Sequence, residues 1–200
     1  MNIAYYISGH GYGHAVRSLE IIKEVLRQDK MIKIHIRTGA PQWLFDTVQD
    51  ERLFFHSRHI EIGVIQHNSY SVDKEKTLKS YAALLQTKQN IIAQEVQFLK
   101  QNHIHLVVSD HTPFAFDAAF SMGIPAIGIA NFSWDWIYAD YLAEFPQYAF
   151  VVNDIKNSYR LGDRLYRLPF YGDMSAYQRI IDLPLIGRKS LANPVEIRQK

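Results

Sequence analysis

The sequence predicts an α/β fold built on a Rossmann-like, open and mostly parallel sheet. Short apolar runs alternate along the chain with longer segments of helical periodicity, and this alternation is typical of repeated strand-helix units. The length of 200 residues suits one such domain with a buried core. With 48% apolar and 21% charged residues, the composition is that of a folded globular protein rather than a disordered one.

Strands are expected where the apolar runs are short and bounded by polar or turn-forming residues. The five predicted strands are residues 2–7, 32–37, 60–66, 104–109 and 125–129, and residues 53–56 are a weaker sixth candidate. Helices are expected between these strands, over residues 14–27, 41–49, 74–101 and 114–122. After the last strand, one helix is expected to end near residue 145 and another to cover residues 153–165. In the long segment, apolar residues recur at intervals of three, four and seven, which predicts one apolar stripe facing the sheet. The stripe comprises Leu78, Tyr81, Leu85, Ile92, Val96 and Leu99.

The periodic pattern weakens after residue 168, where prolines at positions 169, 184 and 194 interrupt it. Residues 1–168 are therefore expected to form the domain, and residues 169–200 a linker and the start of a further, C-terminal domain. A helix is predicted to begin near Asn193, and the chain is expected to continue beyond Lys200.

Composition also narrows the class of protein. The formal net charge is only +2 and no long basic run is present, so nucleic-acid binding is not expected. Because the chain has no cysteine, it has no disulfide, thiolate metal ligand or cysteine nucleophile, and it suits a reducing compartment. The first residues resemble neither a signal peptide nor a membrane span. A cytoplasmic protein without a transmembrane segment is expected.

A loop rich in glycine and histidine joins the first strand to the first helix. Its sequence is Ser8-Gly9-His10-Gly11-Tyr12-Gly13-His14. In an open parallel sheet, ligands bind outside the carboxyl ends of the strands, which is where this loop lies. The glycines allow close approach of the backbone, and the N-terminus of the helix offers free N–H groups. The loop is therefore predicted to bind an anion or the oxygens of a sugar.

Two nucleotide-binding motifs do not fit this loop. A dinucleotide fingerprint would need glycine where the chain has His14, and no Gly-Lys-Ser/Thr follows as in a Walker loop. Arg37 at the end of the second strand would still suit a ribose 2′-phosphate. An NADP-dependent reductase therefore remains an alternative.

The fourth main strand ends at Asp110, which is followed by His111. In the common strand order 3-2-1-4-5, the first and fourth strands are neighbours, so Asp110 is expected to face His14. A carboxylate that orients an imidazole and stabilises its protonated form is the arrangement that a general base requires. The adjacent helix N-terminus would keep that imidazole uncharged beforehand. The alternative for Asp110 is a cap on the helix that begins near Pro113.

Metal binding and stacking on a sugar are two further possible roles for residues near this loop. His10, His14, Asp110 and His111 could converge as metal ligands. A glycine-rich loop is a poor mount for two ligands and no HExxH motif is present, so neither a metal nor another cofactor is expected. Trp134, Trp136 and Tyr138 could stack on a sugar ring or belong to the core.

Three stretches carry a resemblance to a known family. They are Tyr5 to Arg17, Asn131 to Ala139, and Asp182 to Ile186. They resemble the glycosyltransferase-like domain at the N-terminus of plant L-arabinokinase and in related stand-alone bacterial proteins. More distantly, the first stretch is similar to the Gly-Gly-His loop of the peptidoglycan N-acetylglucosaminyltransferase and to the Gly-His loop of plant UDP-sugar glycosyltransferases. The transferases usually have proline three residues after the histidine, where this chain has Arg17.

The resemblance implies the N-terminal, acceptor-side half of a GT-B fold. His14 would be the general base and Asp110 its supporting carboxylate, acting between a small-molecule sugar acceptor and a nucleotide-sugar donor. The donor would be held mainly by a C-terminal domain outside these residues, so the isolated half is expected to be inactive. The other residues expected to bind substrate are Gly9, His10, Gly11, Tyr12, Gly13, Arg17, His111, Asn131 and Trp134. The alternative is a catalytically silent domain that binds a sugar or nucleotide-sugar and regulates a partner.

Overall fold

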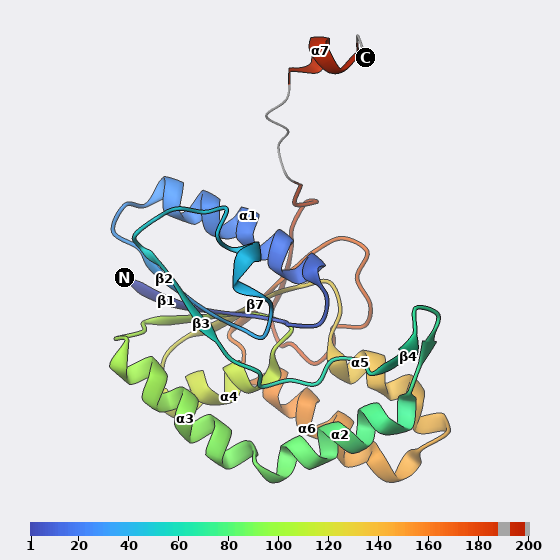
Figure 1. Cartoon of the computed structure of the whole chain (residues 1–200). Helices are drawn as coiled ribbons and strands as arrows, with labels where there is room; N and C mark the ends of the chain where they lie inside the picture. The colour runs from blue at the N-terminus through green and yellow to red at the C-terminus, as the bar shows by residue number, and fades with distance from the viewer. Residues whose placement is uncertain (188–192, 199–200) are drawn as a thin grey trace.

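A seven-stranded parallel sheet forms the centre of the computed structural model, which describes residues 1–187 and 193–198 (Figure 1). The strand order is β3-β2-β1-β6-β7-β8-β9. The strands are β1 (Asn2–Ile7), β2 (Lys33–Thr38), β3 (Leu53–Ser57), β6 (Leu106–Asp110), β7 (Ala126–Ala130), β8 (Arg164–Arg167) and β9 (Ile180–Asp182). This order confirms the predicted Rossmann-like fold and the pairing of the strand that precedes the glycine loop with the strand that ends at Asp110.

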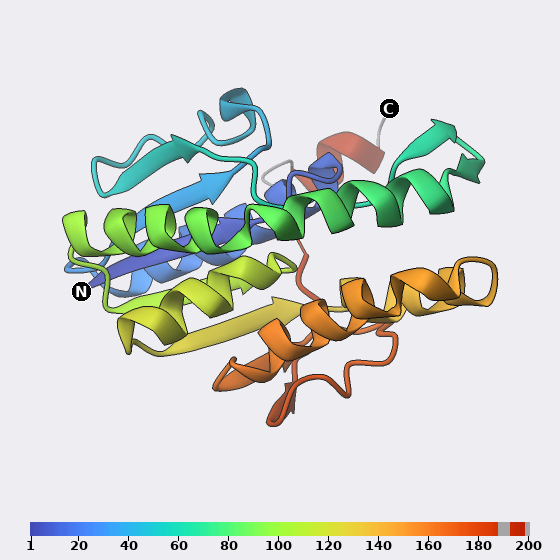
Figure 2. The same cartoon turned by 90° about the horizontal axis from the view of Figure 1, so that it is seen from below.

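Helices cover both faces of this sheet. Figure 1 shows α1 (Tyr12–Gln28) above it, and α2 (Lys74–Gln86), α3 (Lys88–Gln101), α4 (Pro113–Met122) and α6 (Ala149–Arg160) below it. Figure 2 shows α2 and α3 running end to end on the lower face. Each face has its own apolar core: Ile22 and Leu26 of α1 pack in one, and Leu99, Phe116 and Ile155 of the lower helices in the other. The sheet is therefore buried on both sides, as parallel sheets require.

The weak strand candidate forms a strand, whereas one of the stronger candidates does not. Residues 53–57 form β3 at the sheet edge, whereas the prediction of a strand over residues 60–66 was wrong. Ile60, Ile62 and Val64 all pack against the lower core without pairing to a strand. The alternating apolar residues therefore indicated that one side of this segment is buried, but not that its backbone pairs with a strand. The strand that pairs with β2 at this edge is β3.

The single helix predicted over residues 74–101 is two helices, because the chain bends at Thr87. The Thr87 hydroxyl donates to the carbonyl of Leu84 at 2.9 Å, a local hydrogen bond that competes with helix continuation. The apolar stripe is confirmed in part across the break, since Leu78 and Tyr81 of α2 and Leu99 of α3 are buried.

Several boundaries also differ. The segment 41–49 contains only a 3-10 turn, Gln42–Leu44, and the stretch to residue 145 contains α5 (Trp134–Ala139) and a 3-10 turn, Asp140–Ala143. A further 3-10 turn, Pro146–Tyr148, leads into α6, which ends at Arg160, so residue 165 lies in β8 and not in a helix. A small hairpin of β4 (Gln66–Asn68) and β5 (Ser71–Val72) precedes α2.

The sheet continues past residue 168, the expected domain boundary, because β9 pairs with β8. Both strands are short and partly polar, and neither was predicted. The helix expected near Asn193 is present as α7 (Pro194–Arg198), while residues 199–200 lie outside the described residues. Within the described chain, every helix is too short or too polar to cross a membrane.

Candidate active site

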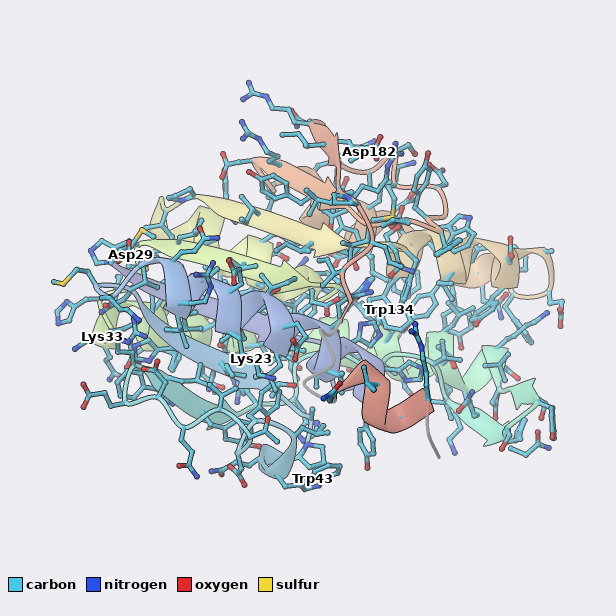
Figure 3. The ribbon with its side chains drawn as sticks, turned by 90° about the horizontal axis from the view of Figure 1, so that it is seen from above. Lys23, Asp29, Lys33, Trp43, Trp134 and Asp182 are labelled. Carbon is cyan, nitrogen blue, oxygen red and sulfur yellow. The ribbon has the colours of Figure 1, made fainter. Side chains whose placement is uncertain are left out.

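The carboxyl ends of β1 and β6 lie side by side, with Ile7 directly opposite Asp110. After β1 the backbone turns through Gly11, whose φ of 82° is in the region that favours glycine, and α1 begins at Tyr12. His14 therefore lies in the first turn of α1. Figure 3 looks down on this helix and shows Trp134 beyond its N-terminal end and Asp29 beyond the other.

The Asp110 carboxylate is the centre of the site and is almost completely buried. His14 Nδ1 lies 3.2 Å, Arg17 Nη2 2.8 Å and His111 Nε2 2.9 Å from its Oδ1 atom. The Ser18 hydroxyl donates to Oδ2 at 2.9 Å. The predicted approach of His14 to Asp110 is confirmed, and the sheet pairing is its cause.

Burial by itself would raise the pKa of Asp110, but the charge and hydrogen bonds of His111 and His14 outweigh it and hold that pKa well below its ordinary value. The carboxylate therefore only accepts hydrogen bonds, so its hydrogen bond with His14 places a proton on Nδ1 of that imidazole. His14 is left with an unprotonated Nε2, the atom that a general base needs. Burial lowers the pKa of His111 to about 4 against the attraction of Asp110, so His111 is neutral at pH 7.

Asp110 does not cap α4. The cap position of that helix is Thr112, and its first turn receives no hydrogen bond from a capping side chain. The helix-cap alternative for Asp110 was therefore wrong, because both carboxylate oxygens face α1 and His111 instead.

Arg17 links Asp110 to the loop after β7. His14 and Asp110 are called the dyad from here on. The Nη1 atom of Arg17 donates to Asn131 Oδ1 at 2.9 Å while Nη2 donates to Asp110. The side chain thus joins Asn131, predicted to bind substrate, to Asp110, predicted to be catalytic, and both hydrogen bonds go to protein groups. Ser18, one turn after His14 in the chain, was missed because a serine within a helix carries no distinctive sequence signal.

The glycine loop is held in place by Glu61, a residue that sequence reasoning missed. The Gly9 amide donates to Glu61 Oε1 at 2.9 Å, and the Thr112 hydroxyl lies 3.3 Å from Oε2. Burial raises the pKa of Glu61. A Cβ atom at Gly9 would lie 3.2 Å from the Gly39 backbone, so the close packing of these loops favours glycine there. Glu61 escaped notice because its segment was interpreted as a strand.

The remaining predicted residues divide between the core and the surface. Trp134 is 1% exposed and packs with Tyr138, which favours the core alternative over sugar stacking. His111 is also buried and stacks on Phe132, with a φ of 68° that is rare outside glycine. Tyr12 is 55% exposed and contacts Trp43. The His10 ring lies edge to face with Trp134, with ring centroids 5.5 Å apart, and Gly13 lies in the first turn of α1.

His14, Asp110 and His111 also have the composition of a metal site, with ligand atoms within 4.8 Å of one another. His10, the fourth candidate, is not part of this group. The Arg17 guanidinium, 2.8 Å from the shared oxygen, would repel a cation there. The hydrogen bonds described above account for the convergence of the three residues.

A cavity of about 130 Å³ lies beside the dyad and shares the glycine loop with it. Gly9, His10, Arg37, Arg58, Glu61 and Thr112 are among its lining residues. Arg37 forms two hydrogen bonds with the buried Glu95, at 3.0 and 2.5 Å. The reductase alternative depended on the whole Arg37 guanidinium as a partner for a 2′-phosphate, and its pairing with Glu95 leaves only the Nη1 atom for such a contact.

Comparisons with known proteins agree with this fold. The chain is 34% identical over 200 residues to L-arabinokinase of Arabidopsis thaliana, a match that covers 98% of this chain and 19% of that protein. UGT2 of Phytolacca americana, complexed with UDP-2fluoro-glucose and pterostilbene, has a TM-score of 0.59 at 12% identity, over 96% of this chain and 54% of that one. Arabidopsis thaliana UGT89C1, complexed with UDP-L-rhamnose, also has a TM-score of 0.59, at 13% identity, over 96% and 53%.

The chain thus spans about a fifth of the length of its curated relative and about half of each solved transferase. The structural likenesses show that its fold is that of one half of a GT-B transferase. Residues 1–145 match the sequence profile of Glycosyl transferase family 1, and the chain belongs to this family.

Proposed function

We propose that this chain is the acceptor-binding half of a glycosyltransferase that moves a sugar from a nucleotide-sugar to an acceptor hydroxyl. The observation that carries the proposal is the contact between His14 Nδ1 and Asp110 Oδ1 at the carboxyl edge of the sheet. Asp110 holds the imidazole so that Nε2 is free to take a proton. Membership of the glycosyltransferase family supplies the reaction class.

In the proposed reaction, His14 Nε2 removes the proton of an acceptor hydroxyl. The acceptor oxygen forms a bond to the anomeric carbon of the donor, and the bond from that carbon to the phosphate oxygen breaks. The nucleoside diphosphate leaves with the electron pair. The negative charge of Asp110 stabilises the protonated His14 that results.

The donor would be held mainly by a second domain, outside this chain. Two of the solved relatives are complexed with UDP-sugars, and this chain matches about half of each. A site divided between two domains gives each half only part of the binding free energy. The chain by itself is therefore expected not to transfer sugar.

A second candidate function is a catalytically silent domain that binds a sugar or nucleotide-sugar and regulates a partner. The ion pair between Arg17 and Asp110 favours it, because a carboxylate neutralised by arginine stabilises a protonated histidine less. Turnover by the complete protein separates the two functions.

The test is a transfer assay of the complete protein that carries this chain, with UDP- and GDP-sugars as donors. We expect His14→Ala to lower transfer by about two orders of magnitude or more, the usual contribution of a general base. His67→Ala, at an exposed histidine of the β4–β5 hairpin, is the matched control and should not change it. Unchanged turnover in His14→Ala would refute the proposed base, and His10 would be tested next. Sugar binding without any turnover in the wild-type protein would favour the silent domain.

A further inference from the structure

The cavity beside the dyad has an unusual charge arrangement. Two of its lining residues, Arg37 and Arg58, share one carboxylate, that of Glu95 in α3. Glu95 is fully buried and also accepts a hydrogen bond from the Tyr6 hydroxyl at 2.9 Å. Because the tyrosine is neutral, this cluster has two guanidinium charges and one carboxylate charge.

Each of the two guanidinium groups uses its Nε and Nη2 atoms for hydrogen bonds within the protein. Arg37 uses Nε and Nη2 for Glu95, and Arg58 uses Nε for Glu95 and Nη2 for Gln94. Within the described chain, neither Nη1 atom has a hydrogen-bond partner. Pairs of guanidinium donors are the usual partners of carboxylate and phosphate groups in proteins.

Glu61 is the acidic residue that lines the cavity. Its oxygens accept hydrogen bonds from the Gly9 amide at 2.9 Å and from the Thr112 hydroxyl at 3.3 Å. Glu61 therefore offers acceptors for a hydroxyl group, while the arginines offer donors for an anion. The cavity therefore suits a ligand that has both an anionic group and a hydroxyl group.

We propose that this cavity binds the anionic group, a carboxylate or a phosphate, of a sugar-like acceptor. The inference rests on the proposed function, since the cavity shares the glycine loop with the dyad. A volume of about 130 Å³ has room for about four water molecules at roughly 30 Å³ each, and so for one acidic group with a neighbouring hydroxyl. The rest of the acceptor would extend from the cavity toward His14.

The test is calorimetry on the complete chain with glucuronate, glucose 6-phosphate and glucose. We expect at least one of the two charged sugars to bind about tenfold tighter than glucose, and the comparison of the two identifies the anionic group. Arg58→Gln should abolish this preference, whereas Arg37 continues to pair with Glu95 and keeps the fold. Arg58→Lys should retain part of it, because the charge remains. Arg27→Gln, at an exposed arginine of α1, is the matched control and should leave the preference unchanged.

Equal affinity for all three sugars, no binding of either charged sugar, or a preference that survives Arg58→Gln would overturn the inference. The same measurement on His14→Ala separates it from the proposed function. His14→Ala should keep the preference for the charged sugar while sugar transfer is lost. If the wild-type protein shows no anion preference while its transfer is intact and depends on His14, the cavity assignment alone is overturned.

Discussion

The Arg17 guanidinium lies 2.8 Å from Oδ1 of Asp110, closer to this oxygen than the imidazole of His14 at 3.2 Å. The two side chains are on the same face of α1, three residues apart, and share one buried carboxylate. Arg17 therefore adds a permanent positive charge beside His14 and Asp110.

Replacing Arg17 should therefore alter the strength of the base. In Arg17→Gln, Asp110 loses its permanent counter-charge, and its full negative charge acts on the protonated form of His14. We expect sugar transfer by the complete protein to rise by up to about tenfold, equivalent to about 1.4 kcal/mol in the barrier. Arg27→Gln on the same helix is the control. A loss of transfer as large as that of His14→Ala would instead make Arg17 part of the catalytic machinery.

Glu95 should contribute strongly to stability. Glu95→Gln removes the buried carboxylate that pairs with both Arg37 and Arg58, and the uncompensated charges should lower the free energy of unfolding by about 3–5 kcal/mol. Chemical denaturation monitored by circular dichroism measures this loss. Glu24→Gln, which breaks an exposed pair with Arg27, should have little effect. Equal effects of the two variants would show that the buried cluster does not stabilise the fold.

His111 should make the fold sensitive to acid. Its pKa is lowered by burial to about 4 in the folded chain, against an ordinary value of 6.5. Between these two values the unfolded chain binds a proton that the folded chain does not, so stability falls as the pH drops from 6.5 to 4. This one group should account for a loss of about 3 kcal/mol across the window. Asp110 adds its own loss only at lower pH, because its pKa is depressed.

His111→Asn tests this assignment. Asparagine tolerates the positive φ of this position and does not titrate. The variant should be less stable at neutral pH, because the stacking on Phe132 is lost, but its free energy of unfolding should depend less on pH between 6.5 and 4. Denaturant titrations at several pH values measure this dependence. An unchanged pH dependence would assign the acid sensitivity to other groups, of which His35 is the first candidate because its pKa is also lowered to about 4.

Chelation should leave the protein unaffected. Hydrogen bonds and the Arg17 ion pair hold His14, Asp110 and His111 together, so the site has no need of a cation. We expect EDTA to change neither the thermal midpoint nor the affinity for sugars. A lower midpoint in EDTA that returns on addition of Zn²⁺ would favour the metal interpretation of the three residues.

The fold class and the approach of His14 to Asp110 could both be predicted from the sequence alone. Alternation of apolar runs and helical segments depends on local periodicity, and it correctly placed β1, β6, β7, α1 and α4. The known strand order of such sheets then placed His14 opposite Asp110, because the carboxyl ends of neighbouring parallel strands meet at one edge.

Long-range packing set which residues lie around the glycine loop and its cavity. Glu61 and Arg58 line the cavity, and Glu95 of α3 pairs with Arg58. Their segments carry no functional signal in the local sequence pattern. The role of Arg17 was also decided by this packing. A side chain on a helix has several possible partners, and the position of Asp110 on the neighbouring strand selects one of them. Sequence periodicity fixes which way a residue faces, whereas hydrogen bonds between side chains depend on distances that only the packed elements set.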